Sequence, residues 1–191
     1  MKFNIFMNEY ILNLKKLLDN IDSNIIEQII YSFEQTIKKK SKVYILGNGG
    51  SASTASHMAN DLGAGLRRRE ILNLDIVSLA DNASVTTAIA NDIGYVNIFY
   101  MQLKDLLKKD DLILALSCSG NSPNIIKAVE YAKKSNIKVI GVTGFDGGKL
   151  KQLSDINFHV ETKSGEYGLV EDIHMILDHI IYTYYIQKGK N

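Results

Sequence analysis

The chain has 191 residues, of which 46% are hydrophobic and 23% charged, and its formal net charge is +1. This length and composition predict a single globular domain over residues 1–191, and the near-zero net charge indicates no general attraction to nucleic acid or to acidic membranes. One cysteine excludes an internal disulfide. Because no apolar run approaches the roughly 20 residues that span a bilayer, we expect a cytoplasmic protein.

Two amphipathic helices precede the first predicted strand. The first covers residues 6–20, and the second begins near Asp22 or Ser23, either of which can cap it. Beyond them, short apolar runs alternate with helical segments. We expect strands at residues 43–46, 74–79, 112–116, 139–142 and 156–160, and helices at 51–62, 82–91, 96–108, 123–134 and 168–187. This alternation predicts an α/β fold with a five-stranded, mainly parallel sheet that helices cover on both faces.

A glycine-rich turn, residues 47–51 (the glycine turn), joins the first strand to the helix after it. Its sequence is Gly-Asn-Gly-Gly-Ser. Glycines let a ligand approach the backbone, and the start of the helix presents unpaired N–H groups and a positive dipole end. A small anionic or polyhydroxylated ligand would fit there. A plain tight turn with a serine cap explains the same residues equally well.

A serine-rich turn, residues 117–122 (the serine turn), follows the third strand. It reads Ser-Cys-Ser-Gly-Asn-Ser and leads into a helix that starts with Pro123. Several hydroxyls beside a helix N-terminus suit a phosphate dianion without any metal. A helix cap explains one of the serines but not three. Ligands in parallel sheets bind at the carboxyl ends of strands, where both turns lie, so we favour phosphate binding here.

Two helices carry histidines with carboxylates at helical spacing. His57 and Asp61 lie one turn apart on the helix after the glycine turn. On the last helix Glu171, His174 and Asp178 share a face, with His179 close to the direction of Glu171. Each group alone is typical of a solvated helix face, but two such helices in one short chain favour a joint acid/base or metal site.

Several motifs taken together resemble the sugar isomerase (SIS) domain, and within it the phosphoheptose isomerases. The motifs are Leu46–Ser51 with His57 and Asp61, Asn91–Asp92, Ser117–Ser122, Thr143–Gly148 and Glu171–His174. The resemblance covers nearly the whole chain, including the two leading helices. It implies an SIS fold, a homotetramer, and an aldose–ketose isomerase that interconverts sedoheptulose 7-phosphate and D-glycero-D-manno-heptose 7-phosphate for bacterial surface polysaccharide.

The resemblance also implies roles for individual residues. The sugar would be bound by Asn48, Gly49, Gly50, Asn91 and Asp92, and the phosphate by Ser51, Ser117, Cys118, Ser119 and Ser122. A divalent metal, usually zinc, would be bound by His57, Asp61, Glu171 and His179, with Asp61, Glu171 and His179 as the acid/base groups. Periodicity leaves His174 open as a ligand in place of His179. The chain departs from the usual pattern in having Asp61 for Glu, Glu171 for Gln and Cys118 for Thr.

Two other functions stay open on the sequence. One relative that looks almost like a phosphoheptose isomerase is a non-catalytic tetrameric scaffold for the bacterial replication initiator. The complete set of histidines and carboxylates favours an enzyme, because a scaffold has no reason to keep it. The second alternative is an isomerase for a different sugar phosphate.

Overall fold

The computed structural model describes residues 2–190 and contains one five-stranded sheet in which every neighbouring pair of strands is parallel. The strands are β1 (Lys42–Leu46), β2 (Asp75–Ser78), β3 (Leu112–Ser117), β4 (Lys138–Phe145) and β5 (Ile156–Glu161), in the order β2-β1-β3-β4-β5. The α/β prediction with a parallel sheet is therefore confirmed. The chain leaves β1 toward β2 and then returns to β3 on the other side of β1, which makes the ends of β1 and β3 a topological switch point.

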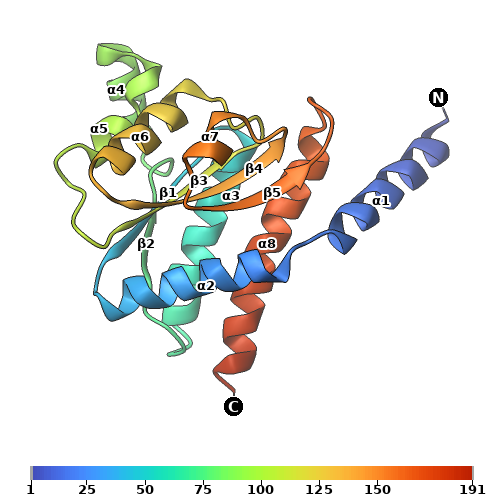
Figure 1. Ribbon diagram of the computed structural model, residues 1–191, viewed down its shortest axis with the longest axis horizontal. Coiled ribbons are helices and arrows are strands. Elements are labelled where there is room, and N and C mark those ends of the chain that lie inside the picture. The colour runs from blue at the N-terminus through green and yellow to red at the C-terminus, as the bar shows by residue number, and fades with distance from the viewer. Residues whose placement is uncertain (1, 191) are drawn as a thin grey trace.

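Helices cover both faces of this sheet (Figure 1). One face packs against α2 (Ser23–Lys38), α3 (Gly50–Met58) and α8 (Tyr167–Lys188), and the other against α5 (Tyr100–Leu103), α6 (Pro123–Lys134) and α7 (Gly148–Leu153). The central strand β3 is buried on both sides, with Leu112, Leu114 and Leu116 facing the first layer and Ile113 and Ala115 the second. A strand that is buried on both faces has a continuous apolar sequence, and residues 112–116 of β3 have one.

The first helix, α1 (Phe3–Asp19), extends away from the rest of the molecule in Figure 1. Only its C-terminal half contacts the core, through Leu14, Leu17 and Leu18. Tyr10 donates a hydrogen bond of 2.6 Å to Asp172 on α8. Among residues 2–190, none of the helices combines the length and apolar character that crossing a bilayer requires.

The predicted helix over residues 96–108 is wrong. The segment contains a single 3₁₀ turn, η2 (Tyr95–Asn97), and then the one-turn helix α5, after which Lys104 has an extended conformation with ψ 125°. Ile98, Phe99 and Leu103 are buried in the second core layer. In the sequence these apolar residues are spaced as on one face of a helix. In the structure they instead anchor a short, bent segment to the core.

Two further differences concern local helix geometry. The structure contains α7, for which the sequence analysis predicted no helix. The helix expected at 51–62 changes at its second half into a π-helix, η1 (Ala59–Gly65). The segment predicted at 82–91 is confirmed as α4 (Ala83–Ile93), and the side chain of Asn82 caps it by accepting a hydrogen bond of 3.0 Å from the Val85 amide.

Candidate active site

The glycine turn and the serine turn lie next to each other because their strands pair. Leu46 at the end of β1 is in register with Ala115 near the end of β3. The Asn48 side chain exchanges two hydrogen bonds of 2.9 Å with Asn124 in the first turn of α6, each amide donating to the other. Tyr95 donates a third, also 2.9 Å, to the side-chain Oδ1 atom of Asn48. The predicted sugar-binding Asn48 is thus held in place by two residues that the sequence analysis did not identify.

The serine turn folds its hydroxyls around its own backbone. Ser117 accepts a hydrogen bond of 3.2 Å from the Gly120 amide, and Ser119 one of 3.3 Å from the Asn121 amide. Gly120 has φ 62°, and its α-carbon packs so closely on the Gly147 carbonyl that any side chain would overlap it. The hydroxyls of Ser117 and Ser122 lie 3.4 Å apart at the start of α6. These predicted phosphate ligands therefore surround one helix N-terminus.

Glu171 on α8 lies against both turns. Its carboxylate occupies the space beside the Gly50 α-carbon, where a side chain would overlap it, and the Cys118 thiol lies 4.0 Å from one of its oxygens. Burial, and then the negative charge of Glu171, raise the pKa of Cys118 to about 11, although Ser51 hydrogen-bonds to the thiol and opposes this shift. Glu171, Ser51 and Cys118 are thereby gathered where β1 and β3 end.

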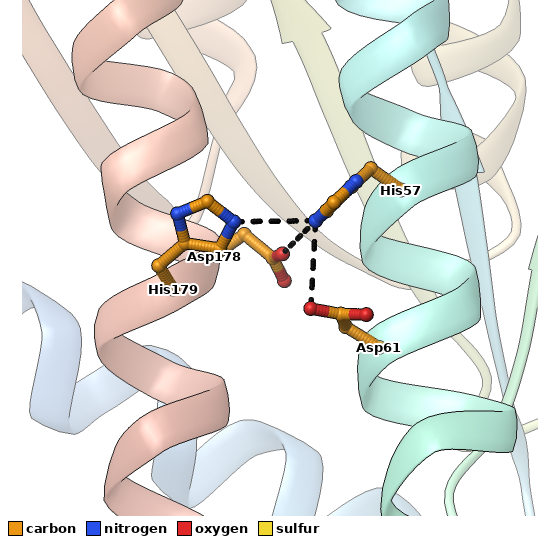
Figure 2. Close-up of side chains that lie close together, drawn as sticks. All are labelled: His57, Asp61, Asp178 and His179. Carbon is orange, nitrogen blue, oxygen red and sulfur yellow. Dashed lines mark hydrogen bonds and ion pairs between the residues drawn. The ribbon is translucent and has the colours of Figure 1, made fainter.

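A second group, the histidine–aspartate cluster (His57, Asp61, Asp178 and His179), lies between α8 and the helix formed by α3 and η1 (Figure 2). From the His57 Nε2 atom, the distances are 3.2 Å to His179 Nε2, 3.4 Å to Asp61 Oδ2 and 3.6 Å to Asp178 Oδ2. One ligand atom from each residue lies within 4.8 Å of every other. Burial, followed by the charge of Asp61, raises the pKa of Asp178 to about 7.

The structure brings together three of the four predicted metal ligands, namely His57, Asp61 and His179, and adds Asp178 to them. The Glu171 carboxylate lies against Gly50 instead. On α8, Glu171 precedes Asp178 by two helical turns. His57 likewise follows Gly50 by two turns on α3. The matching spacing of the pairs Gly50–Glu171 and His57–Asp178 shows that the two helices run side by side in the same direction.

His174, the alternative ligand, lies outside this cluster. It is buried, and its Nε2 atom lies 3.2 Å from the Thr143 carbonyl oxygen, to which it donates. Burial lowers the pKa of His174 to about 4. Asn91 and Asp92 at the end of α4 are exposed and hydrogen-bonded to each other at 2.9 Å. Within residues 2–190 they make no side-chain hydrogen bond to either turn.

Known proteins resemble this chain in both sequence and fold. The SIS domain family matches residues 8–144. A phosphoheptose isomerase of Helicobacter pylori (strain P12) is 38% identical over 168 residues, which cover 88% of this chain and 85% of the relative. The solved phosphoheptose isomerases of Neisseria gonorrhoeae and Francisella tularensis superpose with TM-scores of 0.84 at 27% and 26% identity, each match covering 96% of both chains. A sequence relationship of this extent, on the same fold, means that the chain belongs to the phosphoheptose isomerase family of SIS-domain proteins.

Proposed function

We propose that the protein is an aldose–ketose isomerase that converts sedoheptulose 7-phosphate to D-glycero-D-manno-heptose 7-phosphate. The observation that carries this is the identity of 38% to a phosphoheptose isomerase over 88% of the chain. The site supports it, since a turn rich in hydroxyls and a turn rich in glycine meet at one switch point. In the cell, a cytoplasmic enzyme of this kind supplies heptose for bacterial surface polysaccharide, such as lipopolysaccharide or capsule.

The serine turn suits the phosphate of the substrate. We propose that Ser117, Ser119 and Ser122, with Cys118 and Ser51 beside them, bind its oxygens at the start of α6. That helix has 12 residues, so its first-turn amides and its dipole favour a dianion. The carbon chain of the sugar would then extend over Asn48, Gly49 and Gly50, with Asn91 and Asp92 as further predicted contacts.

Glu171 is the best-placed acid/base group. It lies at the glycine turn, where the reacting end of the sugar would be bound. In the reaction, its carboxylate takes the proton from the hydroxyl-bearing carbon next to the carbonyl, the electron pair forms the double bond of a cis-enediol, and the carbonyl oxygen takes a proton from the solvent. The carboxylate then returns its proton to the former carbonyl carbon on the same face, while the neighbouring hydroxyl loses its proton to the solvent and becomes the new carbonyl, so one carboxylate serves both carbon atoms.

The predicted divalent metal, for which we propose zinc, fits His57, Asp61 and His179. Imidazole nitrogen and carboxylate oxygen are ligands that zinc prefers, and the ligand atoms of these residues lie within 4.8 Å of one another. When bound, such an ion polarises carbonyl and hydroxyl oxygens. Asp61, Glu171 and His179 were all predicted for both roles. As metal ligands Asp61 and His179 have their donor atoms engaged, whereas the Glu171 carboxylate lies at the glycine turn, so we propose Glu171 for proton transfer.

A homotetramer is part of this proposal. The N-terminal half of α1 exposes a set of large apolar side chains: Phe3, Ile5, Phe6, Met7, Ile11 and Leu12, each more than 40% exposed. An apolar surface of this kind is typical of a subunit contact. Light scattering should give four times the chain mass of 21.3 kDa, whereas a monomer at micromolar concentration would contradict the assembly.

The activity is tested by incubating the purified protein with sedoheptulose 7-phosphate and following the aldose product. Conversion is expected, and other ketose phosphates should be converted more slowly. If one of them is preferred, the substrate is wrong but the reaction stands; if none reacts, the chain is not an isomerase. The double variant Ser119→Ala, Ser122→Ala should raise KM strongly, because each hydrogen bond to a charged group contributes about 1.5–3 kcal/mol.

A further inference from the structure

We infer that Asp178 is the fourth ligand of the metal site, so that the histidine–aspartate cluster binds the cation without Glu171. The inference deepens the proposed function, because it concerns the same cation, yet ligand identity can be measured without turnover. It assigns a role to a residue to which the family resemblance gave none, and it leaves the Glu171 carboxylate free at the glycine turn.

The separations between the donor atoms support this assignment. Four ligands held tetrahedrally at 2.0–2.2 Å from zinc lie about 3.3–3.6 Å from one another. In the structure, the separations from His57 Nε2 are 3.2 Å to His179, 3.4 Å to Asp61 and 3.6 Å to Asp178. The distance from His57 to Asp178 therefore fits a tetrahedral zinc site as well as the distances from His57 to the two predicted ligands do.

The environment of Asp178 favours a positive partner for its ionised form. The residue is 0% exposed, and neither carboxylate oxygen has a hydrogen-bond partner among residues 2–190. In its ionised form a buried carboxylate needs hydrogen-bond donors or a cation to compensate for the lost water. Figure 2 shows its oxygens directed toward His57 and into the centre of the cluster. Asp178 is thus a buried carboxylate that has no hydrogen-bond partner within residues 2–190, and it is aimed at the centre of the site.

Hydrogen bonding alone cannot satisfy this arrangement. The Nε2 atom of His57 faces three acceptor-bearing groups, and a single N–H can donate well to only one of them. Its closest neighbour is the Nε2 atom of His179, so at most one proton fits between the two rings. A divalent cation satisfies all four side chains at once, and two neutral imidazoles with two carboxylates make its site formally neutral.

Glu171 is poorly placed for the same ion. It precedes Asp178 by seven residues on α8, which is about 10 Å along the helix axis. Its carboxylate lies against Gly50 and near Cys118, at the other end of the contact between α3 and α8. Of these two acidic residues on α8, Glu171 therefore lies at the glycine turn and Asp178 lies in the histidine–aspartate cluster.

The test compares Asp178→Asn with Glu171→Gln, the matched loss of one charge on the same helix. Zinc affinity is measured by competition with a chromophoric chelator after the protein has been stripped of metal and checked for folding by circular dichroism. Asp178→Asn should weaken zinc binding at least roughly a hundredfold, more than the loss of an outer-shell partner, while Glu171→Gln should leave it within a few-fold of the parent. Unchanged binding by Asp178→Asn, or the reverse order of the two variants, would overturn the assignment.

A second pair of variants gives a signal that appears only on coordination. With Co²⁺ bound, Asp178→Cys should gain a thiolate-to-cobalt charge-transfer band, whereas Glu171→Cys and the parent should not. A band in Glu171→Cys alone would overturn the inference. The sedoheptulose 7-phosphate assay on the parent separates the two proposals: metal binding through Asp178 without conversion refutes only the function, and conversion with metal binding independent of Asp178 refutes only this inference.

Discussion

Glu171 and Gly50 are in contact across the start of α3, and the glutamate carboxylate fills the space that a side chain at position 50 would need. The absence of a β-carbon at position 50 is therefore what permits this carboxylate to lie at the glycine turn. The contact joins the proposed acid/base group to the loop that would bind the sugar.

Gly50→Ala is expected to lower kcat by roughly a hundredfold, the contribution typical of a positioned acid/base group. Stability should change little, because the group displaced is the end of a flexible side chain rather than backbone. Steady-state kinetics and urea unfolding measure the two effects. In a Glu171→Ala background the same change should have no further effect on kcat; additive losses in the double variant would refute the displacement.

Removing the side chain that holds Asn48 should destabilise the fold. Asn124 is 1% exposed and shares two hydrogen bonds with Asn48. Asn124→Ala leaves the half-buried Asn48 side-chain N–H and the buried Ile125 amide without these partners, at a cost of about 1–3 kcal/mol. The matched control, Tyr95→Phe, removes one hydrogen bond at a more exposed position and should cost less. Urea unfolding provides the comparison, and an equal or larger loss for Tyr95→Phe would contradict this reading of the network.

The stability of the protein should depend on pH through His174. In the folded state burial lowers the pKa of His174 from 6.5 to about 4. Its contribution is fully present above pH 6.5 and is lost as the pH falls toward 4, since the unfolded chain takes up a proton that the folded chain does not. His174→Gln, which can still donate to the Thr143 carbonyl, should lose about 3 kcal/mol less than the parent between pH 7 and pH 4. The free energy of unfolding of both proteins is measured from pH 7 to pH 4. An equal change in the parent and in His174→Gln would show that His174 does not titrate in this way.

The Cys118 thiol should react slowly. Because its pKa is raised to about 11, little thiolate exists at pH 8, and alkylation by iodoacetamide should be at least roughly a hundredfold slower than in the urea-unfolded chain. Glu171→Gln removes the neighbouring negative charge and should speed the native reaction. Rapid modification of the parent, or no acceleration in this variant, would contradict the electrostatic explanation.

Much of this architecture could be predicted from the sequence because it rests on local patterns. The apolar run of β3 and the turn that follows it lie within a dozen residues, and parallel pairing alone brings that turn beside the glycine turn. His57 and Asp61 could be paired for the same reason, since one helical turn separates them.

The remaining features of the site depend on how distant segments meet. Periodicity places Glu171 and Asp178 on one face of α8, but which of them reaches His57 is decided by where α3 lies along that face. Tyr95 was missed because it precedes a segment that was predicted as one helix and is folded as two short turns. The only sequence signal for Asn124 was its position one residue after Pro123, at the beginning of α6.

The π-helix η1 makes the geometry of the histidine–aspartate cluster depend on chain length. A π-turn holds more residues than an α-turn, so it accommodates an extra residue while both flanking segments stay packed. Here Met58 before it and Leu66 after it are fully buried, and Asp61 lies between them. Deleting one residue in this segment would restore α-helical geometry with both flanks still packed, but residues within the turn, Asp61 among them, would change direction by up to about 100° about the helix axis. Two chains with the same motif residues, but differing by a single deletion at this point, would therefore direct this carboxylate to different places.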